Sequence, residues 1–84
     1  MNDFDDILEQ TNIRNERMKE FKTLLLSDLK RMYNVVEQGE SFVIKTKNKS
    51  YTYYPMAARI CSKQHCKYIW KDIDNLQLYK IFIK

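Results

Sequence analysis

Residues that active sites and binding loops commonly require are scarce in this chain. Its 84 residues include one glycine (Gly39), one proline (Pro55) and one histidine (His65). Without a glycine-rich loop, the chain lacks the common backbone cradles for phosphate. The candidate for a catalytic nucleophile–base pair is a cysteine beside His65, and the same stretch has no acid that could orient the histidine. We therefore expect a binding protein that is not an enzyme and that needs no cofactor.

Cysteine is scarce as well. Cys61, His65 and Cys66 supply three soft metal ligands within six residues, whereas a structural zinc site takes four, usually in two separated pairs. A second copy of the chain, or Asp72, could complete such a site, but the spacing favours a half-buried Cys61 and a histidine in a loop. We expect no metal, and two cysteines fit a reducing compartment, so the predicted location is cytoplasmic.

Long apolar runs are absent. None approaches the roughly 20 residues of a membrane span. The acidic start MNDFDDILEQ lacks the basic end and apolar middle of a signal peptide. Residues 1–84 are expected to form one small soluble domain. A chain of this length buries roughly 60–65% of its unfolded surface, so its core is thin and self-association or a partner would stabilise it.

The clearest pattern that is present is helical. From about residue 12 to residue 38, large apolar side chains recur with a period of 3.6 on one side, and Gly39 is the predicted stop. Residues 1–39 are thus predicted to be helical. The apolar arc spans about half the helix, wider than the roughly 100° stripe of a surface helix. Part of it is the candidate interface for a homodimer or a target protein. The residues of that interface are Met18, Phe21, Leu25 and Met32.

After Gly39 the period changes to two, which predicts a β-meander over residues 41–61. Its pieces are residues 41–47, residues 51–54 and a short strand at 58–61, with turns at Asn48 and Pro55. Residues 62–84 are harder to assign. A helix within residues 62–80, capped by Asp72 or Asp74, is favoured over a strand at 78–84. The predicted fold is α+β: a long N-terminal amphipathic helix packed on a small antiparallel β-meander, with a short C-terminal helix or strand.

Charge is unevenly spread along the chain. Residues 1–40 hold nine acids and six bases, whereas residues 41–84 hold two acids and nine bases. The stretch from residue 41 to residue 71 has no acid, and aromatic residues lie among its cations. Such a combination is typical of nucleic-acid binding, in which lysines neutralise phosphates and tyrosines stack on bases. The predicted site for RNA or single-stranded DNA comprises Lys45, Lys47, Lys49, Tyr51, Tyr53, Arg59, Lys63 and Lys67. The plainer alternative is a solvated lysine face over a tyrosine-rich core.

The register of the predicted hairpin separates these two readings. A two-residue turn at Asn48 and Lys49 would point Tyr51 and Tyr53 into the core and leave Tyr54 facing outward. A three-residue turn would point Tyr51 and Tyr53 toward solvent, because a slip of one residue moves every side chain to the other face.

Residue usage rich in Lys, Asn, Ile and Tyr resembles that of small accessory proteins encoded by phages and mobile elements. This resemblance is one of composition and assigns no residue. It leaves a second hypothesis: a protein–protein inhibitor or adaptor that docks its basic face or its amphipathic helix on a host enzyme, such as a defence nuclease or a polymerase.

Overall fold

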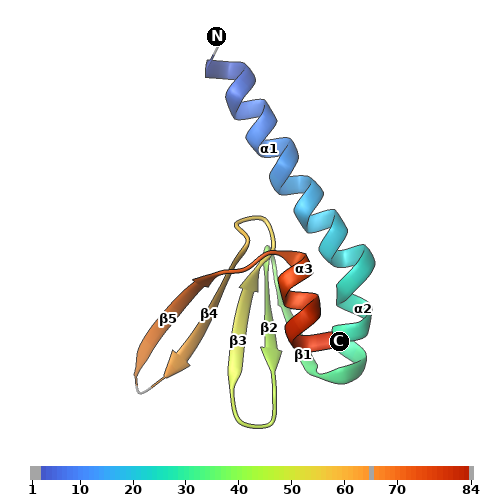
Figure 1. Cartoon of the computed structure of the whole chain (residues 1–84), viewed down its shortest axis with the longest axis vertical. Coiled ribbons are helices and arrows are strands. Elements are labelled where there is room, and N and C mark those ends of the chain that lie inside the picture. The colour runs from blue at the N-terminus through green and yellow to red at the C-terminus, as the bar shows by residue number, and fades with distance from the viewer. Residues whose placement is uncertain (1–2, 65, 84) are drawn as a thin grey trace.

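A computed structural model describes residues 3–64 and 66–83 (Figure 1). Helix α1 (Asp3–Glu20), the π-helical segment η1 (Phe21–Leu25) and helix α2 (Leu26–Met32) follow one another without a gap. Five strands come next: β1 (Asn34–Gln38), β2 (Ser41–Lys45), β3 (Ser50–Tyr54), β4 (Arg59–Gln64) and β5 (Lys67–Asp72). Helix α3 (Asn75–Leu78) and the π-helical segment η2 (Tyr79–Ile83) end the described chain. The predicted α+β class is confirmed.

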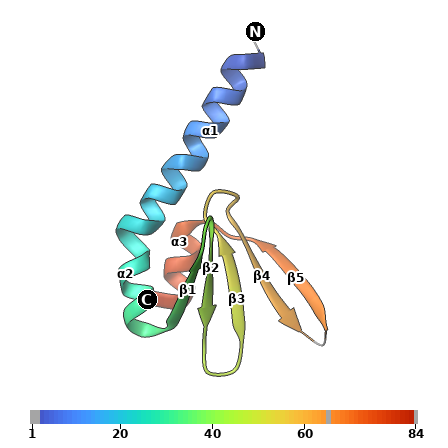
Figure 2. The same cartoon turned by 180° about the vertical axis from the view of Figure 1, so that it is seen from behind.

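The strands form one antiparallel sheet in chain order, β1-β2-β3-β4-β5. The helices lie on one side of this sheet, with α3 in front of β1 and the β4–β5 hairpin away from the helices (Figures 1 and 2). We call the helix-covered side the inner face and the opposite side the outer face. Residues alternate between these faces along each strand.

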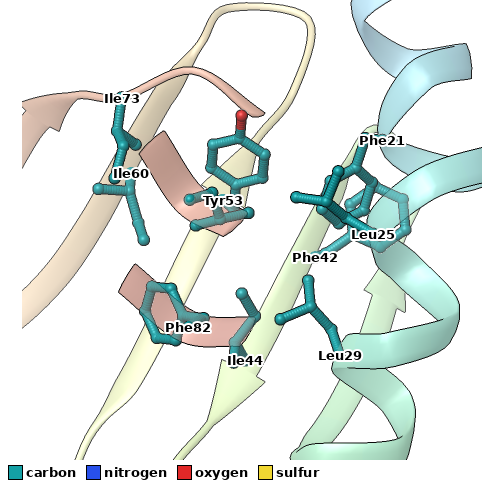
Figure 3. Packing of buried hydrophobic residues seen from close by; sticks show 10 residues of the cluster. Phe21, Leu25, Leu29, Phe42, Ile44, Tyr53, Ile60, Ile73 and Phe82 are labelled. Carbon is teal, nitrogen blue, oxygen red and sulfur yellow. The ribbon is translucent and has the colours of Figure 1, made fainter. Parts of the chain in front are cut away.

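The core lies between the helices and the inner face (Figure 3). Phe21, on the helix, packs against rings from two strands, with centroids 4.6 Å from Phe42 and 5.3 Å from Tyr53. Leu25 and Leu29 continue the helical side of the core at the expected spacing of four residues. The helix therefore buries the centre of the apolar arc that its sequence predicts, whereas Leu24 and Met32 remain exposed.

A buried hydrogen-bond network ties three elements together beside this core. The Tyr53 hydroxyl donates to Asn75 Oδ1 at 2.9 Å. Asn75 Nδ2 in turn donates to the Arg17 carbonyl and to Glu20 Oε1, each at 3.0 Å. Burial, with the carboxylates of Asp74 and Glu20 nearby, raises the pKa of the Tyr53 phenol well above its usual value. The neutral hydroxyl thus joins β3 to α3 and, through Asn75, to α1.

The prediction of helix through residue 39 is wrong at its end. The helix stops at Met32, and Asn34–Gln38 is strand β1, which pairs with β2. Gly39 lies at the first position of the two-residue turn between these strands, with φ +65°. That geometry matches a type II′ hairpin turn, in which glycine is favoured at this position. The glycine therefore reverses a hairpin instead of ending a helix.

The C-terminal third contains both a strand and a helix. The β-meander continues past residue 61, because Lys67–Asp72 forms β5 against β4. Helix α3 then begins at Asp74, whose carboxylate accepts a hydrogen bond from the Gln77 amide while the Gln77 side chain accepts one from the Asp74 amide. This capping box confirms Asp74 as the cap. The alternative of a strand from residue 78 is wrong for the described residues, since Tyr79–Ile83 is helical.

The hairpin register places Tyr51 and Tyr53 on the inner face. Tyr51 pairs with Ile44, and Tyr53 pairs with Phe42. The Thr46 amide donates to the Lys49 carbonyl at 2.8 Å, so the turn is centred on Lys47 and Asn48. That centre lies one residue earlier than in the predicted two-residue turn. Tyr51 and Tyr53 therefore each pair with a residue two positions earlier in β2 than the predicted turn gives. Their side chains still lie on the face that a two-residue turn predicts.

Candidate nucleic-acid interface

The outer face is an open surface that the described helices do not cover (Figure 2). A row of side chains crosses all five strands there, because each member pairs with the next: Val36, Val43, Thr52, Cys61 and Trp70. By the same alternation, larger polar and aromatic residues flank this row. They are Lys45, Tyr54, Arg59, Lys63, Tyr68 and Asp72. Neighbouring strands lie roughly 4.8 Å apart, so these side chains form one continuous surface.

Three partly exposed rings lie on this surface. Tyr68 is 67% exposed and Trp70 is 48% exposed, although both are large and apolar. Tyr54 packs beside Trp70, with ring centroids 5.6 Å apart. These rings come from β3 and β5, on either side of β4, and they cover the buried Cys61 between them in the sheet. Exposed rings on an open sheet are the kind of surface on which unpaired bases stack.

Cations lie directly over two of these rings. The Arg59 guanidinium carbon is 5.0 Å from the Trp70 ring centroid, and Lys63 Nζ is 5.9 Å from the centroid of Tyr68. Arg59 Nε also approaches Asp72 Oδ1 at 3.5 Å across the strand pair. This exposed ion pair lies beside the guanidinium that is placed over the indole. Exposed aromatic rings and positive charges are thus adjacent.

Five lysines gather at one end of the sheet, which we call the lysine-rich end. The β2–β3 and β4–β5 hairpins both turn at this end (Figure 1). Its residues are Lys45, Lys47, Lys49, Lys63 and Lys67, all exposed. The strands and loops that carry these lysines, as far as they are described, contain no Asp or Glu at this end. The lysine-rich end is therefore a cationic rim beside the aromatic surface.

The structure corrects two members of the predicted site. Tyr53 is fully buried against Phe21 and cannot stack on a base. Tyr51 is half-buried on the inner face, with its ring 5.3 Å from that of Phe82. The six predicted cations are all exposed, but they do not share one face. Lys45, Arg59 and Lys63 occupy the outer face, Lys47 and Lys49 the loop, and Lys67 an inner-face position of the edge strand β5.

The candidate interface on the helix is also corrected in part. Phe21 and Leu25 are buried in the chain's own core, so they are unavailable to a partner. Met18 is half-buried against that core, and Met32 is exposed at the end of α2. The wide apolar arc is explained mainly by the sheet and by α3 and η2, which together cover it.

The rings of the outer face, Tyr54, Tyr68 and Trp70, are absent from the sequence-based site. They can be identified from the alternation of side chains between the two faces along each strand. Once Tyr53 is assigned to the core, Tyr54 must face outward, and pairing through β4 then puts Trp70 and Tyr68 on the same side. Sequence patterns alone do not fix which residues face outward, because that depends on whether the turn between β2 and β3 has two or three residues.

The possible metal ligands are only partly described. Cys61 is buried and Cys66 is exposed, and both are free thiols. His65 lies outside the described residues. Across residues 3–64 and 66–83, no three His, Cys, Asp or Glu side chains gather in a metal-binding arrangement.

Comparisons of the chain with protein-family models, with curated proteins and with solved structures found no match. None of the helices in the described part of the chain combines the length and the apolar character that crossing a membrane requires.

Proposed function

We propose that the protein binds single-stranded nucleic acid, RNA or DNA, on the outer face of its sheet and performs no chemistry on it. The observation that carries this proposal is the set of exposed rings, Tyr68 and Trp70 above all, with cations packed over them. A soluble domain gains nothing in stability from exposing these rings, and their exposure is typical of a binding surface.

In this proposal, bases stack on Trp70 and Tyr68 while the sugar–phosphate backbone runs toward the lysine-rich end. Lysines neutralise phosphates and release their condensed counterions, so affinity falls as salt rises. Stacking favours unpaired bases, because the bases of a duplex are already stacked on one another. Lysine is a flexible point charge, and Arg59 alone supplies a planar fork on this face. Sequence preference should therefore be weak.

Fluorescence anisotropy with end-labelled 20-nucleotide probes tests the proposal. The probes are oligo-uridine, oligo-thymidine and a duplex of mixed sequence, measured at several salt concentrations. We expect the single strands to bind more tightly than the duplex, with affinity that falls linearly on a log–log salt plot. Equal affinity for duplex and single strands would contradict the stacking surface, and no binding at low salt would contradict the proposal.

Two double variants with the same change of charge locate the binding surface. Lys63→Gln with Lys67→Gln removes two charges at the lysine-rich end. Lys19→Gln with Lys22→Gln removes two exposed charges on α1 and η1. The first pair should weaken binding and flatten the salt dependence, because two phosphate contacts are lost. The second pair should leave both nearly unchanged. Equal effects of the two pairs would mean that binding responds only to net charge.

A protein partner is the second candidate, supported by a different surface. Leu24 and Leu76 are exposed beside Tyr79, in a hollow between η1 and α3 that Glu20 and Asp28 also line. Exposed apolar side chains of this kind are typical of protein interfaces. Affinity capture from a nuclease-treated lysate separates the two candidates. One protein recovered in stoichiometric amount, and lost with Leu24→Asp, would favour the inhibitor or adaptor.

A further inference from the structure

An apolar groove lies on the inner face, beside the C-terminal helix. Its volume is about 340 Å³, and it runs between η2 and the inner positions of β3, β4 and β5. Ile69 on the strand side and Ile81 on the helix side are 46% and 58% exposed at its borders. The described helices lie at the β1 side of the sheet, and β4 and β5 lie away from them (Figure 1). The groove is therefore an apolar surface that the described part of the chain leaves without a partner.

The charges around the groove are all positive. Lys71 lines it, and Lys80 lines the adjoining hollow together with Lys71 and Ile81. None of the described residues that line either hollow is acidic. An occupant complementary to this surface is apolar where it meets Ile69 and Ile81 and acidic at its edges.

The first turns of α1 have this combination of residues. Positions 3–9 contain four acids and no base, and Phe4, Ile7 and Leu8 recur there at helical spacing. In both views α1 extends beyond the sheet, and none of the other described elements lies beside its first turns (Figures 1 and 2). Further along α1, the Arg17 guanidinium donates to the Met56 carbonyl at 3.0 Å and ties the helix to the loop between β3 and β4. The backbone of this helix end thus extends away from the sheet, and its sequence is amphipathic.

The helix cannot place its start in the groove of the same molecule. The helical backbone runs without a gap from Asp3 to Met32, and its first turns point away from the sheet. Folding them back onto η2 would require breaking this helix. A second copy of the chain has no such constraint. Two copies related by a twofold axis can each insert residues 3–9 into the other's groove, which makes two identical contacts and closes the assembly.

We propose that the protein forms a homodimer in which residues 3–9 of each copy occupy the groove bordered by Ile69 and Ile81 of the other. The groove lies on the opposite side of the sheet from Trp70, so dimer formation leaves both outer faces open. This proposal does not depend on the proposed nucleic-acid binding, since it concerns the other face of the sheet.

Light scattering on a size-exclusion column, at several protein concentrations, gives the molar mass in solution. We expect twice the 10.3 kDa of the chain at high concentration. Ile81→Glu on the groove side and Ile7→Glu on the helix side should each raise the dimer dissociation constant by at least about tenfold, because a carboxylate then faces apolar surface. Val36→Glu, at an exposed apolar position on the outer face and away from the groove, is the matched control and should leave the mass unchanged. Circular dichroism checks that each variant is folded.

A charge exchange identifies the two partners. Lys71→Glu with Lys80→Glu should weaken the dimer, and so should Asp5→Lys with Asp6→Lys. An equimolar mixture of these two variants should form a heterodimer in which both contacts again bring opposite charges together, and a chain carrying all four substitutions should recover the dimer. A chain that stays monomeric at every concentration would overturn the proposal. A dimer that survives Ile81→Glu, or that the four substitutions fail to restore, would overturn it as well.

Discussion

The two faces of the sheet are built from the same strands and differ sharply in what they contact. On β3, Tyr53 is fully buried against Phe21 and Phe42, while the next residue, Tyr54, lies beside Trp70 on the outer face. The inner face holds Phe42, Ile44 and Ile60 under the helices, and the outer face holds Thr52, Arg59 and Lys63. One face stabilises the fold, and the other retains exposed rings and charges.

This difference shows that aromatic content alone does not identify a binding surface. Tyr51, Tyr53, Tyr54, Tyr68 and Trp70 all lie in the basic half of the chain. Two of them face the core, and three face outward. Substitutions at neighbouring residues of one strand can therefore separate stability from binding.

The largest expected effect is on stability. Tyr53→Ala should lower the free energy of unfolding by about 3–5 kcal/mol, because it leaves a cavity beside Phe21 and removes the hydrogen bond to Asn75. Tyr54→Ala, one residue away on the other face, should cost clearly less, since its ring is only half-buried. Urea denaturation measures both. Equal losses would contradict the assignment of the two faces.

A smaller effect, on binding alone, is expected at Trp70. Trp70→Ala should weaken single-strand affinity by roughly 1–3 kcal/mol, which is about 5- to 150-fold, because it removes a stacking surface. Tyr79→Ala, which removes an exposed ring on the helical side, is the control and should not change affinity. Anisotropy titrations measure both variants. An unchanged affinity for Trp70→Ala would exclude this ring from the site.

The hydroxyl of Tyr53 can be tested without creating a cavity. Tyr53→Phe keeps the ring and removes the donor to Asn75 Oδ1, which leaves a buried acceptor without its partner. We expect a loss of about 1–3 kcal/mol in the free energy of unfolding. Urea denaturation at neutral pH measures the loss. A variant as stable as the parent chain would mean that the network between β3, α3 and α1 contributes nothing.

Alkaline pH should reduce the difference in unfolding free energy between the parent chain and Tyr53→Phe. Burial, together with Asp74 and Glu20, raises the pKa of Tyr53, whereas an unfolded tyrosine titrates near pH 10. A group with a raised folded pKa contributes stability below its unfolded pKa and loses that contribution as pH rises further. The difference in unfolding free energy between the parent and Tyr53→Phe should therefore shrink above about pH 10. A difference that stays constant from pH 8 to pH 11 would contradict this account.

The sequence predicts the helix, except for its end, the meander and a helix cap at Asp72 or Asp74, because each rests on local chemistry. Each of these signals depends on residues that are close together in the sequence. They are the apolar periodicity, the β-branched residues and a carboxylate at a helix start. Strand β1 was missed because Val35 and Val36 fit either period. Their state depends on pairing with Val43 and Ile44, and the glycine between the strands permits either a helix end or a hairpin turn.

The candidate site was predictable in its charges and not in its rings. Lysines such as Lys47 and Lys63 are exposed on either face of the sheet. An error in the strand register therefore does not remove them from the predicted site. The rings of Tyr53 and Tyr54 exchange faces with a shift of one residue. The number of residues in the turn decides between them, and Lys47-Asn48-Lys49 offers no glycine that marks a two-residue turn.

Trp70 permits the most direct test of the binding face, because it is the single tryptophan of the chain and lies at the centre of the proposed surface. Its intrinsic fluorescence is recorded while oligo-uridine or oligo-thymidine is added at low salt. We predict saturable quenching, because a base stacks on the indole, and we predict that high salt reverses it. Binding seen by anisotropy with no change in Trp70 fluorescence would contradict the assignment of the outer face.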